Sequence, residues 1–145
     1  MQAIQAQRSS LSEEAFRSEL DAARKIETGF PSPAADHIEK ALNLEDLVVY
    51  RPSTTFYVRA EGDSMNASCI YDGDILIVDR SIYPQHGNIA IFALDGEPVI
   101  RRFVRQNDHI LLVSDDAKLR PIPIFSETDW AIWGVITHVI HRYKL

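Results

Sequence analysis

A chain of 145 residues with a formal charge of −6 has the size of one domain and is long enough to bury a core. The negative charge argues against direct nucleic-acid binding, which requires clustered lysine and arginine. No apolar run has the length of a membrane span, and Met1 to Arg8 lacks the apolar core of a signal peptide, so we expect a cytoplasmic protein. The single cysteine, Cys69, excludes an internal disulfide and any multi-cysteine metal site.

The first third of the chain predicts an arm with short helices, residues 1–46. Apolar residues recur at helical spacing from Leu11 to Ile26. The prolines in Phe30–Pro33 disfavour a continuous helix, and a second helix is expected from Ser32 until Asn43 ends it. The arm should cross the surface of the domain that follows.

From Leu47 onward, β-branched and aromatic residues alternate with turn residues, which predicts many short strands. Asp95-Gly96 is a strong hairpin signal, and Gln106-Asn107-Asp108 marks the next turn. No long helix intervenes, so residues 47–145 are expected to form a mainly β, curled antiparallel domain, as a sandwich or partly open barrel. The expected strands are Phe56–Ala60, Ile75–Asp79, Ile89–Leu94, Val99–Arg105, Ile110–Ser114, Arg120–Phe125 and Trp130–Tyr143.

The stretch Glu61-Gly62-Asp63-Ser64-Met65 carries the main candidate for chemistry. Ser64 is either a turn residue or a nucleophile presented by a tight bend after a strand. Cys69 is a weaker alternative nucleophile. The histidines lack metal-ligand spacing, the glycines form no phosphate loop, and the acidic residues around Gly73 indicate a turn, so we expect no metal and no cofactor.

Several motifs together resemble one family. In chain order they are Gly29-Phe30-Pro31-Ser32-Pro33-Ala34, Gly62-Asp63-Ser64-Met65, Asp72-Gly73-Asp74, Val78-Asp79, His86-Gly87, Asp95-Gly96-Glu97 and, near the end, Trp133-Gly134-Val135-Ile136. This series resembles the UmuD branch of the LexA/UmuD self-cleaving serine peptidases, from Thr28 to the C-terminus. The resemblance implies a LexA/signal-peptidase-like β fold, usually a homodimer, with Ser64 as nucleophile.

The resemblance also implies a biological role. Family members cut a bond in their own arm when stimulated by RecA on single-stranded DNA, and here that bond would be Thr28-Gly29. The helix Leu11–Ile26 is too solitary for a DNA-binding helix-turn-helix, which disfavours a repressor. The implied role is an accessory subunit of an error-prone translesion DNA polymerase in the SOS response to DNA damage. The implied partners are the RecA filament, a UmuC-like polymerase subunit and the polymerase sliding clamp.

One departure from the family pattern affects the mechanism. The family's general base is a lysine on the strand after the Asp-Gly-Glu turn, and Arg101 occupies that position here, followed by Arg102. A guanidinium stays protonated and offers no acceptor, so it cannot take the proton of Ser64. Two hypotheses remain: a subunit that cannot cut itself, or an active peptidase with a substitute base that cuts Thr28-Gly29.

The strand Trp130–Ile140 carries apolar residues on both faces. A small monomer rarely hides so much apolar surface on one core, so this strand is expected to take part in the homodimer.

Overall fold

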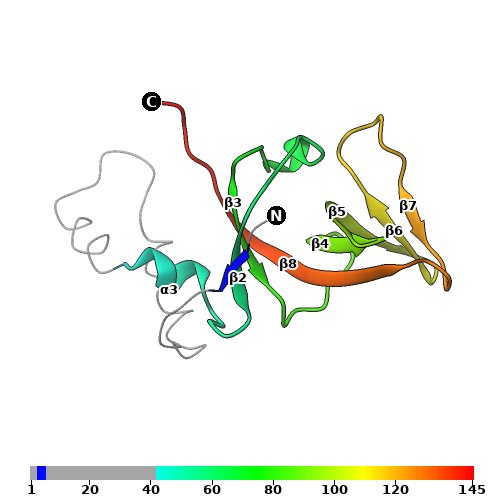
Figure 1. Ribbon diagram of the computed structural model, residues 1–145, viewed down its shortest axis with the longest axis horizontal. Helices are drawn as coiled ribbons and strands as arrows, with labels where there is room; N and C mark the ends of the chain where they lie inside the picture. Colours follow the sequence, from blue (N-terminus) through cyan, green and yellow to red (C-terminus); the bar gives the residue numbers. More distant parts are fainter. Residues whose placement is uncertain (1–2, 6–41) are drawn as a thin grey trace.

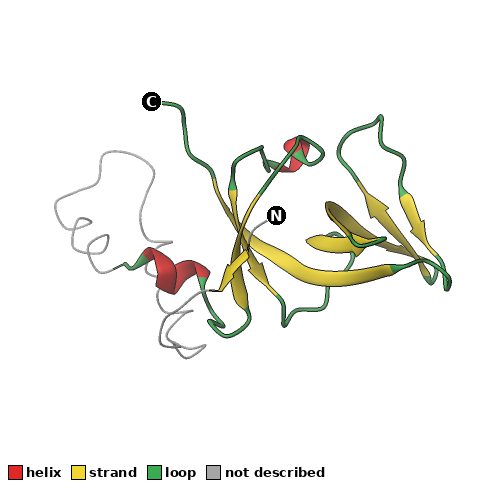
Figure 2. Ribbon diagram, viewed as in Figure 1, coloured by secondary structure: helices red, strands yellow, loops and turns green. Residues whose placement is uncertain are grey.

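The computed structural model describes residues 3–5 and 42–145 and shows one antiparallel sheet (Figures 1 and 2). The strand order is β1-β2-β3-β8-β4-β5-β6-β7. The expected helix Leu11–Ile26 and the bond Thr28-Gly29 lie outside the described residues. The expected helix Ser32–Leu42 lies outside them as well, except for Leu42. The strands are β1 (Ala3–Gln5), β2 (Thr55–Arg59), β3 (Ile75–Asp79), β4 (Ile89–Leu94), β5 (Glu97–Gln106), β6 (His109–Val113), β7 (Ile122–Ile124) and β8 (Trp130–Ile140).

All the expected strands are present, and the mainly β, antiparallel fold class is confirmed. The sequence did not indicate β1, which pairs with β2 at the edge of the sheet, because three residues in a polar stretch give no periodic signal. The hairpin turns follow the prediction. Asp95 and Gly96 have φ of 50° and 80°, and Asn107 and Asp108 have φ of 45° and 66°, as tight two-residue hairpin turns require.

Asn43 was expected to end a helix that lies, apart from Leu42, outside the described residues, and in the structure it begins the next helix. Its side-chain Oδ1 accepts a hydrogen bond from the backbone N–H of Glu45 at 2.9 Å, which caps the short helix α3 (Leu44–Val48). Asparagine favours this position because its oxygen satisfies an N–H that has no partner in the first turn. Within the described residues, no helix has the length and hydropathy that crossing a membrane requires.

Strand β8 joins the two halves of the sheet by pairing with β3 along one part and β4 along another. The register shifts once in each pairing, and β8 curves through the molecule as the long orange strand of Figure 1. Gly134 lies at this crossing. A Cβ atom there would lie 2.6 Å from Val78 Cγ1, so a glycine is required for the strands to approach.

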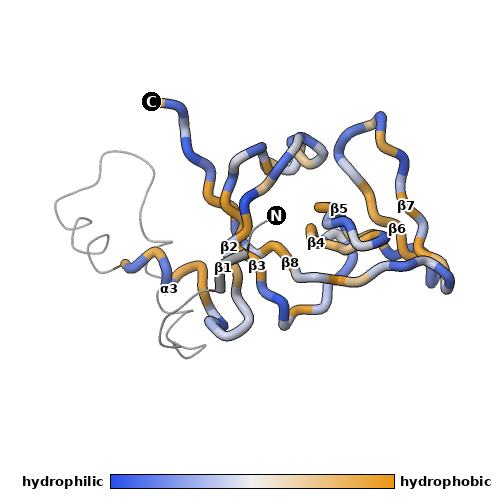
Figure 3. The backbone as a smooth tube through the Cα atoms, viewed as in Figure 1, coloured by the Kyte–Doolittle hydropathy of each residue, from blue (hydrophilic) through white to orange (hydrophobic). Residues whose placement is uncertain are grey.

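Curling of the sheet buries both faces of β4. Ile91 belongs to one core cluster with Leu76 and Val78, whereas Ala90 and Phe92 belong to a second cluster. The strands carry most of the hydrophobic residues, and the turns are mainly hydrophilic (Figure 3). The apolar residues of β8 divide between the two clusters as well: Trp133, Ile136 and Val139 pack on the first, and Trp130, Ile132 and Val135 on the second. The two faces of β8 are therefore largely covered within one chain.

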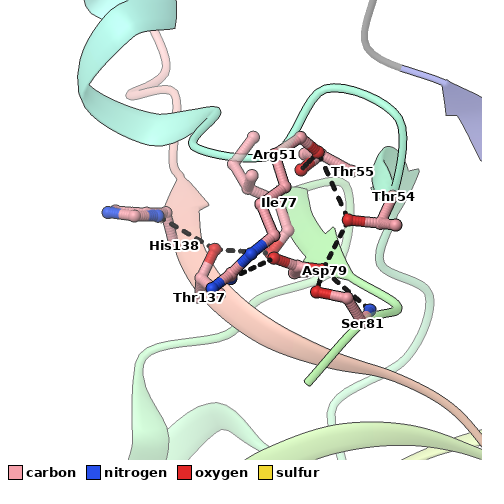
Figure 4. Close-up of polar contacts among 8 residues, drawn as sticks. All are labelled: Arg51, Thr54, Thr55, Ile77, Asp79, Ser81, Thr137 and His138. Carbon is pink, nitrogen blue, oxygen red and sulfur yellow. Dashed lines mark hydrogen bonds and ion pairs between the residues drawn. The ribbon is translucent and has the colours of Figure 1, made fainter. Parts of the chain in front are cut away.

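A buried carboxylate fixes the start of the domain to the end of β3. Asp79 is 4% exposed, and its oxygens accept hydrogen bonds from Thr54 Oγ1, the Ser81 N–H and hydroxyl, and Arg51 Nη1, at 2.6 to 3.3 Å (Figure 4). Burial alone would raise the pKa of Asp79, but these hydrogen bonds outweigh it and lower the pKa below its ordinary value. The carboxylate is fully satisfied and has a structural role.

Candidate active site

Ser64 lies in the turn that follows β2, on a loop that is fixed at both ends. Gly62 has a φ of +87°, and its N–H donates to Asp72 Oδ1 at 2.8 Å. A left-handed conformation of this kind is accessible to glycine at little cost, which explains the residue at this bend. Beyond Ser64, the side chain of Met65 is buried in the first core cluster, and a 3₁₀ turn, η1 (Asn66–Ser68), follows. Ser64 itself is half-buried.

The backbone carbonyl of Ser64 is held by the loop after β6. It accepts hydrogen bonds from Ser114 Oγ at 2.7 Å and from the N–H of Asp115 at 2.9 Å. Two donors on one carbonyl fix the plane of the peptide that follows Ser64. Sequence reasoning missed both residues, because their hydrogen bonds span about fifty positions and no local pattern indicates them.

The side chain of Arg101 meets the hydroxyl of Ser64. Arg101 lies on β5 opposite Ala90, and its Nη1 donates to Ser64 Oγ at 3.2 Å and to the carbonyl of Ile100 at 2.7 Å. Burial lowers the pKa of Arg101, but a guanidinium keeps its charge in proteins and has no lone pair for a proton. The two residues that the sequence singled out are therefore in direct contact, with the arginine as donor.

Neighbouring residues of a strand point to opposite faces of the sheet, so Arg102 hydrogen-bonds to other groups than Arg101 does. Its Nη1 donates to the carbonyl of Gly87 at 2.8 Å and its Nη2 donates to Ser68 Oγ at 2.6 Å. Arg102 thus ties η1 to the turn before β4. The lysines of the described domain, Lys118 and Lys144, are exposed, and neither lines the cavity beside Ser64.

A cavity of about 240 Å³ opens beside the Ser64 hydroxyl. It has an apolar wall from β2, β4 and β5, and a polar wall that carries charges of both signs. Such a mixture of apolar lining and a few polar groups is usual for sites that hold a peptide or small ligand. The lining residues are Val58, Arg59, Glu61, Gly62, Asp63, Ser64, Ile91, Pro98, Val99, Ile100 and Arg101.

The remaining candidates lie elsewhere. Cys69 is exposed and does not line this cavity. Asp72 accepts from Gly62, and Asp74 accepts from the N–H of Tyr71 at 2.9 Å and contacts His141 at 2.5 Å. Across residues 3–5 and 42–145, no three histidine, cysteine or acidic side chains gather closely enough to hold a metal ion. The acidic residues near Gly73 therefore order turns.

The curled antiparallel sheet places a half-buried serine and a strand-borne cation at the wall of one cavity. Residues 21–137 match the family model described as Peptidase S24-like. The chain is 43% identical to Protein ImpA of Salmonella typhimurium over 123 residues, which are 84% of this chain and 83% of that protein. It is 36% identical to Protein MucA of Escherichia coli over 84% of each chain.

A third relative extends the comparison to repressors. The chain is 34% identical to the LexA repressor of Caldicellulosiruptor saccharolyticus over 119 residues, 81% of this chain and 56% of that protein. The chain therefore belongs to the Peptidase S24-like family, and the resemblance to the UmuD branch of the LexA/UmuD proteins is confirmed.

Proposed function

We propose that the protein is a UmuD-like accessory subunit of an error-prone translesion DNA polymerase in the SOS response, and that it cannot cut itself. The observation that carries the second half is the contact of Arg101 Nη1 with Ser64 Oγ at 3.2 Å. A serine hydroxyl becomes a strong nucleophile when a neutral base accepts its proton. Arg101, which can only donate hydrogen bonds, occupies the position where the base would be.

The proposal assigns Ser64 to the nucleophile position and Arg101 to the general-base position, where it is inactive. The bond that a competent member would cut is Thr28-Gly29 in the arm. What supports the assignment is the tight turn that presents Ser64, the adjoining cavity and the family relationship. An uncut arm would then remain attached to the domain throughout the response.

The proposed partners are a second copy of the chain, the RecA filament on single-stranded DNA, a UmuC-like polymerase subunit and the sliding clamp, all in the cytoplasm. The homodimer prediction now rests on a smaller surface than the sequence suggested, because β8 packs largely within its own chain. The exposed apolar residues at and beyond the end of β8 are Ile140, Tyr143 and Leu145, which are 39%, 80% and 109% exposed.

The role is tested in cells that lack their own UmuD-like protein but keep the polymerase subunit. The full-length chain and a truncated form that begins at Gly29 are expressed separately, and damage-induced mutation frequency and co-purification with the polymerase subunit are measured. The proposal expects the full-length chain to bind the polymerase subunit. Failure of both forms to bind it or to change mutation frequency would contradict the role.

A peptidase with a substitute base is the competing function, and the intact loop around Ser64 is the observation in its favour. It requires a second group that accepts the Ser64 proton. Self-cleavage of the unaltered chain at Thr28-Gly29 distinguishes the two.

A further inference from the structure

Arg101 is a half-buried cation whose described hydrogen bonds go to neutral oxygens alone. Its two acceptors are the hydroxyl of Ser64 and the carbonyl of Ile100. The ion pairs found among residues 42–145 join Arg51 to Asp79 and His141 to Asp74, and neither includes Arg101. Partial burial costs a charge part of its hydration, and an anion that entered the cavity would compensate for that loss.

The hydroxyl of Ser64 supplies a second donor beside the guanidinium. A serine oxygen that accepts from Arg101 keeps its own hydrogen free to donate elsewhere. Ser64 and Arg101 both line the cavity of about 240 Å³, so both groups can reach one ligand. A carboxylate has two acceptor oxygens, and the planar fork of arginine matches that geometry better than a lysine would.

The backbone beside Arg101 is suited to an extended peptide. Residues Glu97–Arg101 of β5 pair with β4 on one side, whereas pairing with β6 begins only at Arg102. In the described part of the chain, the second edge of this segment has no strand on it. A free edge binds an added strand through main-chain hydrogen bonds, and Val99 and Ile100 add apolar lining.

The charged side chains that line the cavity also restrict which ligands can bind there. Glu61 and Asp63 line the same cavity and offset the two cations there, Arg59 and Arg101, so the cavity has no excess of positive charge to hold a small free anion. A peptide with basic side chains near its end would satisfy these carboxylates while its own terminal carboxylate meets Arg101. The favoured ligand is therefore an anion delivered on a basic, extended chain.

We propose that the cavity at Ser64 and Arg101 is a receptor for the C-terminal carboxylate of an extended peptide of a partner protein. This inference rests on the proposed function only for the two residues at the centre of the site, Ser64 and Arg101. Binding of the peptide does not depend on whether the arm is cut. Arg101 and the Ser64 hydroxyl bind the carboxylate, the free edge of β5 pairs with the peptide backbone, and Glu61 and Asp63 meet its basic side chains.

The test compares two synthetic peptides on the unaltered full-length protein. Acetyl-Lys-Val-Lys-Val-Ala carries a free C-terminal carboxylate in one peptide and a terminal amide in the other, and binding is followed by calorimetry and by amide NMR shifts at residues 62–65 and 99–101. The acid is expected to bind at least about tenfold more tightly than the amide, since a desolvated charge-assisted pair is lost in the amide. Equal affinities, or no binding of either peptide at millimolar concentration, would overturn the proposal.

Matched arginine variants locate the effect. Arg101→Met should abolish the preference for the acid, whereas Arg102→Met should keep it, because Arg102 bonds to Ser68 and Gly87 instead. Loss of the preference in Arg102→Met, or its survival in Arg101→Met, contradicts the assignment. Sodium acetate is the remaining probe: if it binds as tightly as the peptide acid, the site is a general anion site and the peptide receptor is wrong. Self-cleavage of the unaltered chain would refute the proposed function without affecting these affinities.

Discussion

Two charged side chains of this molecule are placed in opposite ways. Asp79 is 4% exposed and receives hydrogen bonds from Thr54, Ser81 and Arg51. Arg101 is half-buried in a cavity wall, and its described acceptors are neutral. The first charge is compensated by the fold, while the second has only neutral acceptors among the described residues. A compensated charge should matter for stability, and an uncompensated one for function.

The largest expected effect comes from restoring a base at position 101. Arg101→Lys should create or greatly speed cleavage at Thr28-Gly29, by about a hundred- to ten-thousand-fold, which is the usual contribution of a general base. Val99 and Phe103 share the face of β5 with residue 101, and burial favours the neutral amine. The fraction of intact chain is followed over time at several pH values, with and without activated RecA filament.

The control for that experiment is Ser64→Ala in the Arg101→Lys background, which should stop cleavage. If the lysine form stays intact even at alkaline pH with RecA filament, either the strand register assigned to position 101 or the cleavage bond is wrong.

The second-largest expected effect is on the free energy of unfolding, and it should differ between substitutions of Asp79 and Arg101. Asp79→Asn should lower the free energy of unfolding by about 2 kcal/mol, because hydrogen bonds to a buried charge are among the stronger ones. Arg101→Met should change it by less than about 0.5 kcal/mol, since the side chain lines an open cavity. Urea unfolding of both variants checks the difference, and equal losses would remove the distinction between the two sites.

Acid unfolding offers a smaller test of the Asp79 site. The pKa of Asp79 is lowered in the folded protein, so its stabilising contribution is present above the unfolded value, about 4, and is lost as the pH falls through the folded value. The unaltered protein should lose stability over this range more steeply than Asp79→Asn. Parallel profiles for the two proteins would show that Asp79 does not contribute to the acid transition.

The smallest effect concerns His138, which lies beside the Asp79 cluster (Figure 4). Burial lowers the pKa of His138 in the folded state, so the unfolded chain takes up the proton first as the pH falls below about 6.5. Stability should therefore decline slightly below that pH and stop declining once the folded value is passed. His138→Gln should remove the slope, and His109→Gln, at an exposed position, serves as the control.

Much of this could be predicted from the sequence because it depends on local signals. Alternating apolar residues and turn pairs such as Asp95-Gly96 located β2 to β8. Ser64 and Arg101 were singled out by the resemblance to the UmuD branch, because the local sequence leaves Ser64 open as a simple turn residue. The rest depends on contacts between distant parts of the chain. Ser114 and Asp115 hold the Ser64 carbonyl across the loop after β6, and both faces of β4 are buried only because β8 crosses the sheet.

Asn43 shows the limit of local reading. Asparagine is favoured at both ends of helices, and the sequence does not say which end it serves. In the structure Asn43 caps the start of α3, through the hydrogen bond from the Glu45 N–H to its side chain.

If Arg101 leaves Ser64 without a base, the unaltered protein cannot cut itself at Thr28-Gly29. Purified chain is held at alkaline pH, with and without activated RecA filament, and its mass is followed over time. The full-length chain is expected to persist under both conditions. A fragment ending at Thr28, absent from the Ser64→Ala variant, would show that another group activates Ser64 and would contradict the claim.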